Sequence, residues 1–418
     1  MIQASSGSRI QSWQRLLVLT CLIQFFVVLG LQMTFPYIPL FMQKELGIVR
    51  GEEAAFWTGI AGIGSGATMF LTGPLWGYLG DRVGHKKNIL RATFVTALVY
   101  IPLGLAQNVL QFTVALTFFG LATGTWVANM ALLSTVLPRE RVPFAIGMLQ
   151  VAAFVGMTLG PLPGGLIADT LGFRAAYFVA SACLAMAGAI ALFFLHEPRK
   201  AGPAVQAFGW SNLVGVARAK GVAPSLTVVL LATMLPQMIL PVIPVYIQSL
   251  RESAPASLAG LAFTLQSLTA AISAYTAVWV ARRAGLGRMI VLCAIAYSLL
   301  YFLLFLSHSV GAVLVMMALI GFLWGGMSVA VNTLIGLVAP RGQQGTTYGF
   351  LQSVSAIGFW LGPLMGGTMA RAVGMREVFL FSAGTLLAMA PASWLLLKAA
   401  PIQSDAAPAE PQLERRRP

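Results

Sequence analysis

Twelve apolar segments, most of them about 20 residues long, recur along the whole chain and constrain its fold more than any other feature. A stretch of about 20 apolar residues spans the ~30 Å hydrocarbon core of a bilayer as an α-helix. Hydrophobic residues make up 58% of the chain and charged residues only 9%, which is too little charge to cover a soluble protein of this size. The sequence therefore predicts an all-α membrane protein with twelve transmembrane helices.

Short polar segments separate the expected spans. The first span follows a polar start without a small-residue cleavage site, so we expect a retained helix rather than a signal peptide. The three cysteines all lie within spans and are expected to be packing residues. We place the spans at residues 16–42, 55–79, 88–107, 109–136, 144–169, 174–195, 223–249, 256–281, 288–307, 310–338, 346–370 and 376–398.

The net charge of +14 raises the question of nucleic-acid binding. With the N-terminus placed inside, 20 of the 26 basic residues fall in inside segments, whereas the twelve acidic residues divide six and six. An excess of Lys and Arg in cytoplasmic loops is the positive-inside rule. The charge therefore predicts a multi-pass membrane protein with both termini in the cytoplasm and no nucleic-acid partner.

The longest polar stretch between spans runs from His196 to about Gly221 and divides six spans from six. The tail after Ala400 is rich in Pro, Ala and charge, which is typical of disorder. We therefore expect a cytoplasmic N-terminus (1–15), a six-helix bundle (16–195), a cytoplasmic linker (196–222), a second six-helix bundle (223–398) and a disordered cytoplasmic tail (399–418).

The two halves repeat at nearly constant offsets. Span 1 carries a Gln-Met pair, a Pro-x-x-Pro motif and a further Gln, starting at Gln32, and span 7 repeats them 205 positions later, starting at Gln237. Span 11 repeats the small residues of span 5 at an offset of 202. Parallel repeats suit alternating access, because one half can rock against the other. The repeated residues of span 5 are Gly147, Gly156, Gly160, Pro161, Gly164 and Gly165; such glycines allow close helix packing and the proline bends the helix.

The segment between spans 2 and 3 is a candidate gating loop. Its glycines allow a tight turn, and Asp81 can accept hydrogen bonds from helix N-terminal amides or pair with an Arg and so hold the cytoplasmic side shut. Its basic residues can anchor at anionic headgroups. The alternative is an ordinary positive-inside loop. The candidate residues are Gly77, Gly80, Asp81, Arg82, Gly84, Lys86 and Lys87.

This loop resembles the G-x-L-x-D-R-x-G-R-K-x motif of the major facilitator superfamily, with His85 in place of the usual Arg. Span 5 matches G-x8-G-x3-G-P-x2-G-G, which is associated with exporters in that superfamily. The chain thus resembles the twelve-span drug:H+ antiporter group along essentially its whole length. The resemblance implies two pseudo-symmetric six-helix bundles, inward and outward states, a central cavity and proton exchange for substrate.

Three departures qualify the resemblance. Arg282 stands where the acid of the second-half loop would fall, so gating is expected to be asymmetric. Leu116 precedes Gly120 where the family usually has an Arg linked to proton handling. None of the acids or histidines lies in the middle of a span, although an intramembrane ionisable residue would be a functional candidate. Coupling therefore runs through groups near the faces (Asp81 or Asp169) or through titration of the substrate, or transport is uncoupled.

The missing acid also bears on the substrate. A buried carboxylate would be the obvious partner for a cationic drug, so a neutral, zwitterionic or weakly amphipathic molecule fits better. The polar side chains at depth are amides, which either line the cavity or join helices by hydrogen bonds. The cavity candidates are Gln32, Gln237, Asn129, Asn332, Trp126 and Tyr37.

The leading hypothesis is a secondary active transporter of a bacterial-type inner membrane that exports small organic molecules, which are drug-like, amphipathic or a secreted metabolite such as a siderophore. An importer of sugars or organic anions is an alternative, but no basic residue lies mid-span to bind an anion. A non-transporting sensor or a membrane-embedded enzyme is a second alternative, for which no reactive constellation is found. We expect no catalytic residue, metal or cofactor, the proton gradient as energy source, the bilayer and a small molecule as partners, and a functional monomer.

Overall fold

The computed structural model describes residues 6–197, 222–251, 254–284, 286–338 and 344–399, and every element in these residues is a helix. Ten segments of them are long and apolar enough to cross a membrane. The two helices that follow, α16 (Gln344–Val373) and α17 (Met375–Ala399), stand at the expected eleventh and twelfth spans. The expected fold class of twelve helices in two bundles is therefore confirmed.

The first half contains the six spans that were expected between residues 16 and 195. Its first helix begins at Ser6 and so includes part of the segment assigned to the N-terminus. The elements are α1 (Ser6–Thr34), η1 (Phe35–Tyr37), α2 (Ile38–Glu45), α3 (Gly51–Val83), α4 (His85–Leu105), α5 (Val109–Ala122), α6 (Thr125–Val136), η2 (Arg139–Arg141), α7 (Val142–Leu159), α8 (Pro161–Leu171) and α9 (Phe173–Phe194).

The second half repeats this order after the linker, most of which lies outside the described residues, as does the tail from residue 400. Besides α16 and α17 it contains α11 (Val222–Met238), α12 (Ile243–Leu250), α13 (Ala256–Ala284), α14 (Leu286–Leu306) and α15 (Val310–Val338). Spans 1 and 7 are each interrupted at their Pro-x-x-Pro motif, because proline lacks the N–H that would continue the helical bonding.

Span 4 is also interrupted, although it contains no proline. Its two helices, α5 and α6, are separated by Thr123 and Gly124, and Gly124 adopts a φ of 132°. This left-handed region is accessible to glycine without steric cost. Span 4 therefore consists of two helices that can change direction at Gly124.

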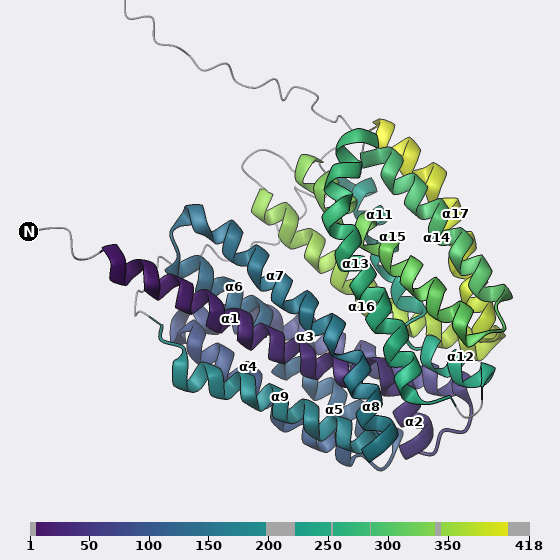
Figure 1. Cartoon of the computed structure of the whole chain (residues 1–418), viewed down its shortest axis with the longest axis horizontal. Coiled ribbons are helices and arrows are strands. Elements are labelled where there is room, and N and C mark those ends of the chain that lie inside the picture. Colours follow the sequence, from purple (N-terminus) through teal and green to yellow (C-terminus); the bar gives the residue numbers. More distant parts are fainter. Residues whose placement is uncertain (1–5, 198–221, 252–253, 285, 339–343, 400–418) are drawn as a thin grey trace, which may run out of the picture.

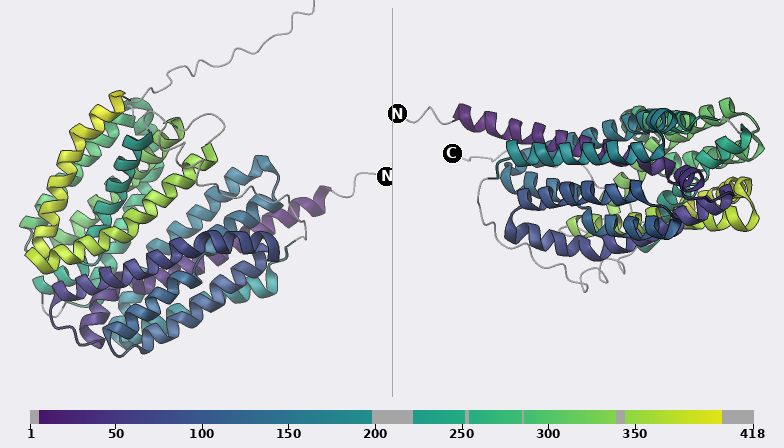
Figure 2. Two further views of the ribbon diagram at one scale, coloured as in Figure 1. Left: turned by 180° about the vertical axis from the view of Figure 1, so that it is seen from behind. Right: turned by 90° about the horizontal axis from the view of Figure 1, so that it is seen from below.

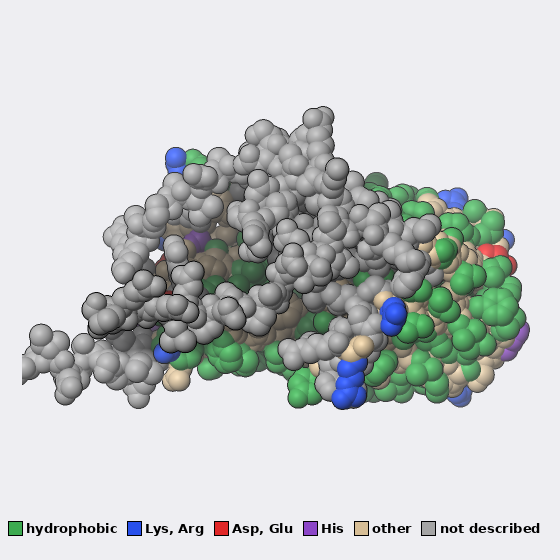
Figure 3. All heavy atoms as spheres, turned by 90° about the horizontal axis from the view of Figure 1, so that it is seen from above, with side chains coloured by type: hydrophobic (Ala, Val, Ile, Leu, Met, Phe, Trp, Pro, Cys, Tyr) green, Lys and Arg blue, Asp and Glu red, His purple; other side chains and the backbone are tan. Residues whose placement is uncertain are grey.

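The two halves converge at one end and diverge at the other (Figures 1 and 2). Each half has its own hydrophobic core, and the halves contact each other through α3 with α16 and α8 with α13. We call the end at which α8 ends and α13 begins the closed end, and the end that carries the α3–α4 turn the open end. Hydrophobic side chains cover most of the visible face of the second half, with charged side chains toward its ends (Figure 3).

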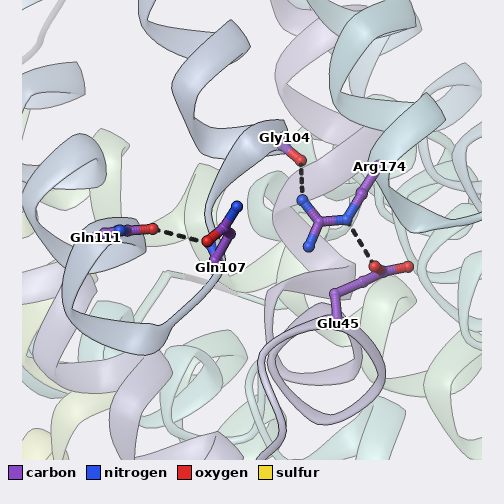
Figure 4. Close-up of polar contacts among 5 residues, drawn as sticks. All are labelled: Glu45, Gly104, Gln107, Gln111 and Arg174. Atoms are coloured by element: carbon purple, nitrogen blue, oxygen red, sulfur yellow. Dashed lines mark hydrogen bonds and ion pairs between the residues drawn. The ribbon is translucent and has the colours of Figure 1, made fainter.

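An ion pair ties the closed end of the first half together (Figure 4). Arg174 Nε donates to Glu45 Oε2 at 2.8 Å, and its Nη1 donates to the carbonyl of Gly104 at 2.8 Å. Beside it, the backbone N–H of Gln107 donates to Gln111 Oε1 at 2.9 Å. Arg174 thus joins α9 to the ends of α2 and α4. These helix ends lie in the same half as α8, which packs against α9 and contacts α13 of the second half.

Candidate functional site

The glycines of span 5 bring its helices into backbone contact with α1. A Cβ at Gly156 would lie 2.9 Å from the carbonyl oxygen of Phe25, and one at Gly164 would overlap Met33. The chain continues through Gly160 with helical dihedral angles, and only Pro161 interrupts the bonding. The close packing and the bend that the sequence predicts both occur here.

The second half reproduces this contact. A Cβ at Gly160 would lie 2.6 Å from the Cβ of Gln32, and a Cβ at Gly362 would lie 2.6 Å from the Cβ of Gln237. The two glutamines therefore occupy equivalent positions against the two bent helices. Gly147 differs, since a Cβ there would meet no atom within 4 Å.

The amides of the candidate cavity residues divide into two kinds. Asn129 is buried, and its Nδ2 donates to Gln24 Oε1 at 3.1 Å, which joins α6 to α1. Gln32 and Gln237 are half-buried, and neither amide forms a hydrogen bond within the described part of the chain. Asn129 is thus placed as a helix-joining residue, whereas Gln32 and Gln237 keep amide groups that a ligand can bind. The side chain of Asn332 lies outside the described structure.

The two aromatic candidates lie in different surroundings. Tyr37 is 2% exposed, and its hydroxyl donates to the carbonyl of Pro161. A Cβ at Gly165 or Gly260 would meet the same hydroxyl, so Tyr37 lies between the halves at the closed end. Trp126 is half-buried against the hydrophobic core of the first half. Neither residue lines the cavity described next.

A small cavity of about 20 Å³ lies between the halves next to the closed end. Ligand sites typically measure 300–1,000 Å³, and this one has room for about one water molecule. The cavity is therefore too small to be a complete substrate site. We call the region formed by its lining residues the apex. Its lining carries no charge and consists of Phe35, Ile38, Pro39, Thr58, Gly62, Leu116, Leu240, Pro241, Phe359, Trp360 and Pro363.

Aromatic rings from both halves meet at this apex. The ring centroid of Phe35 lies 6.5 Å from that of Phe359 and 6.3 Å from that of Trp360. Phe359 and Trp360 were not predicted from the sequence as site residues. Their repeat-related positions hold Met157 and Thr158, so the internal repeat gave no signal for them.

The candidate gating loop is a one-residue turn at the open end. Gly84 adopts a φ of 109° between α3 and α4, and a Cβ at Gly80 would lie 3.1 Å from Asn88 Nδ2. Gly84 requires glycine because of its φ, and Gly80 approaches the Asn88 side chain closely, whereas a Cβ at Gly77 would meet no atom within 4 Å. The expected close approach is therefore present at Gly80 and Gly84 and absent at Gly77.

An acid other than Asp81 caps the helix after this turn. Glu197 accepts hydrogen bonds of 2.9 Å from the backbone amides of His85 and Lys86, and the ammonium of Lys86 donates to Leu192. Glu197 is the second residue of the linker assigned from the sequence (196–222), and no role was predicted for it beyond that of an acid outside the spans. The side chain of Asp81 lies outside the described structure, Arg82 stacks on Tyr78, and Lys87 is exposed.

Arg91 stabilises the break in span 4. Its guanidinium carbon lies 3.6 Å from the centroid of the Trp76 ring, and its Nη1 donates to the carbonyl of Ala122 at 2.7 Å. Trp76 Nε1 donates to the neighbouring carbonyl of Leu121 at 2.8 Å. A cation at a helix C-terminus is favourable because the last carbonyls lack intrahelical partners. Arg91 and Trp76 thus connect the α3–α4 hairpin to the hinge at Gly124.

The described residues contain no group of three His, Cys, Asp or Glu side chains that could hold a metal ion. The geometry instead combines two repeated helix pairs, a closed end, an open end and an uncharged apex between them. The sequence profile of the Major Facilitator Superfamily matches residues 20–257 and 251–417. The chain belongs to the Major Facilitator Superfamily. Proteins of this superfamily are membrane transporters, so the chain is a multi-pass transporter and not an enzyme.

Two named relatives align with this chain over nearly its whole length. The multidrug resistance protein MdtG of Citrobacter koseri is 28% identical over 390 residues, which cover 93% of this chain and 96% of MdtG. MdtG of Escherichia coli is 27% identical over 390 residues, which cover 93% of this chain and 95% of MdtG. The chain is therefore similar over its whole length to proteins named for multidrug resistance.

Solved structures share the fold at low identity. A bacterial homologue of the human lysosomal transporter Spinster, in an inward-facing and occupied conformation, aligns with a TM-score of 0.74 at 14% identity, covering 92% of this chain and 96% of that one. A point mutant of the nucleoside transporter NupG aligns with a TM-score of 0.76 at 12% identity, covering 92% of this chain and 99% of that one. These similarities concern the fold alone.

Proposed function

We propose that this transporter exports small uncharged or weakly amphipathic organic molecules across a bacterial inner membrane. The observation that carries the proposal is the apex between the halves, which is aromatic and uncharged. An aromatic wall favours apolar and planar molecules, and the amides of Gln32 and Gln237 can supply hydrogen bonds without selecting for charge. The similarity to proteins named for multidrug resistance supports export of such compounds.

The proposed topology and energy source follow from the charge distribution and the resemblance to proton antiporters. With 20 of 26 basic residues on the inside, both termini and the open end face the cytoplasm. The conformation described here is then inward-facing, ready to take up substrate from the cytoplasm or the inner leaflet. The proton gradient drives its return through the outward-facing state.

Accumulation of fluorescent neutral dyes in a bacterial strain without its own efflux pumps tests this function. Cells that produce the protein should accumulate less dye, and a protonophore should remove the difference. Trp360→Ala should weaken efflux with the protein still in the membrane, because it removes an aromatic ring that packs on Phe35. Phe381→Ala on α17 is the matched control, since Phe381 is 42% exposed and lies outside the apex. Equal dye accumulation with and without the wild-type protein would refute the proposal.

A further inference from the structure

A carboxylate of the first half caps a helix of the second half at the closed end. Asp169, in the last turns of α8, accepts hydrogen bonds from the backbone amides of Ala256 at 2.6 Å and Ser257 at 2.9 Å. These residues begin α13, whose first turn contains no acid of its own. The first amides of a helix have no intrahelical partner and favour an anion. The two halves must separate here before the closed end can open, and α13 then loses its cap.

The repeat-related contact at the closed end, between α16 and α3, has a cation in place of the carboxylate. The 202-residue offset relates Asp169 to Arg371 near the end of α16, and the 205-residue offset relates Ala256 to Gly51 at the start of α3. The guanidinium carbon of Arg371 lies 4.6 Å from the centroid of the Phe56 ring of α3. The first turn of α3 carries Glu52 and Glu53. At this contact the second half therefore contributes a cation, and the helix of the first half has acids in its own first turn.

We propose that Asp169 and Arg371 are the positioning residues that hold the closed end shut. Asp169 acts at the contact of α8 with α13, and Arg371 acts at the contact of α16 with α3. Both act through a partner on the other half, so each stabilises only the conformation with this end closed. Opening leaves the amides at the start of α13 uncapped, whereas α3 keeps Glu52 and Glu53 in every conformation. The Asp169 contact therefore sets the equilibrium between the two conformations more strongly than the Arg371 contact. The inference rests on alternating access and not on the proposed substrate.

Two spin labels can measure this equilibrium by pulsed electron–electron distance measurements on the full chain in nanodiscs. Val49→Cys and Ser309→Cys place labels on exposed residues at the closed end of the two halves, with Cys21, Cys183 and Cys293 replaced.

Asp169→Asn should raise the ratio of open to closed distances roughly threefold to tenfold, the change expected for loss of one charge-assisted contact. Arg371→Gln should raise it about threefold. A second label pair at the open end, Val83→Cys with Arg288→Cys, should report the opposite change.

Two control variants separate this role from simple helix capping. Glu197→Gln removes a carboxylate that likewise binds two helix N-terminal amides, but within one half, so the ratio at the closed end should stay at its wild-type value. Adding Ser257→Asp to Asp169→Asn gives α13 an acid of its own without reconnecting the halves, so the ratio should stay raised. A wild-type ratio in Asp169→Asn, a return to it with Ser257→Asp, or an equal change in Glu197→Gln would each overturn the Asp169 assignment, and an unchanged ratio in Arg371→Gln would overturn the Arg371 assignment. The distances need no substrate, so failure to find any exported compound would count only against the proposed function.

Discussion

Glu197 accepts a hydrogen bond of 2.9 Å from the backbone amide of His85, so an acid at the start of the linker caps the helix that follows the α3–α4 turn. A second bond of the same length from Lys86 makes the cap bidentate. The linker is therefore attached to the turn by a side chain as well as through α9.

Glu197→Ala tests this attachment. Loss of a side-chain cap typically costs about 1 kcal/mol, and the substitution removes both hydrogen bonds that Glu197 accepts from the backbone amides of His85 and Lys86. We expect a lower midpoint of thermal unfolding in detergent and weaker efflux, with Glu197→Asp intermediate. Glu140→Ala is a suitable control, because Glu140 is exposed in η2. Unfolding curves of Glu197→Ala that match the wild type would contradict the cap.

Gly160 and Gly147 provide a matched pair within one helix motif. A Cβ at Gly160 would lie 2.6 Å from the Cβ of Gln32 and 3.0 Å from the carbonyl oxygen of Leu29, whereas a Cβ at Gly147 would meet nothing within 4 Å. Overpacking of this kind costs about 1–3 kcal/mol. Gly160→Ala should therefore reduce efflux at equal membrane levels, and Gly147→Ala should leave it unchanged. Similar efflux by the two variants would mean that α1 adjusts to the added methyl group.

Gln32 and Gln237 are expected to affect substrate preference, whereas Gln24 is expected to affect stability. The first two amides are half-buried without hydrogen bonds in the described residues, and Gln24 bonds Asn129 across two helices. Gln32→Ala with Gln237→Ala should change the relative efflux of different dyes at an unchanged unfolding midpoint. Gln24→Ala should cost about 0.6–2 kcal/mol and lower the efflux of all dyes alike. A uniform loss in the Gln32 and Gln237 variant would identify both residues as helix-joining.

The internal repeat predicted those parts of the site that both halves share. The offsets of 205 and 202 relate Gln32 to Gln237 and Gly160 to Gly362. The structure repeats the contact between them, because a Cβ at Gly160 would lie 2.6 Å from the Cβ of Gln32 and a Cβ at Gly362 would lie 2.6 Å from the Cβ of Gln237. The charge pattern and segment lengths likewise predicted twelve spans, because both reflect the bilayer directly.

The repeat could not predict contacts that exist in one half only. Phe359 and Trp360 correspond to Met157 and Thr158, so these two aromatic residues have no aromatic counterpart at the repeat-related positions. Glu197 also had no signal, since the position of a loop acid says nothing about which helix it reaches. Asp169 was predicted near a face of the membrane, but its bonds to α13 depend on how the two halves are docked. Such contacts come from tertiary packing, which periodicity does not encode.

Arg91 is expected to stabilise the interruption of span 4 by binding the carbonyls at the end of α5. Its Nη1 lies 2.7 Å from the carbonyl oxygen of Ala122, and its Nη2 donates to Asn88 Oδ1 at 2.9 Å. Hydrogen bonds from a charged group contribute about 1.5–3 kcal/mol, so Arg91→Ala should destabilise the protein by about 2 kcal/mol and loosen the hinge at Gly124. Arg91→Lys should restore only part of the loss, because a single ammonium cannot reproduce the planar fork on Trp76.

Thermal unfolding in detergent and hydrogen exchange of residues 119–128 measure the two effects of the Arg91 variants. Exchange should become faster around Thr123 in Arg91→Ala, since α5 then ends without its cation. Arg82→Ala is the control, because Arg82 is exposed and stacks on Tyr78 of its own helix at 4.6 Å; its effect should stay below about 1 kcal/mol. If the Arg91 and Arg82 variants were equally stable and exchanged at the same rate, Arg91 would be a surface charge rather than the cap of α5.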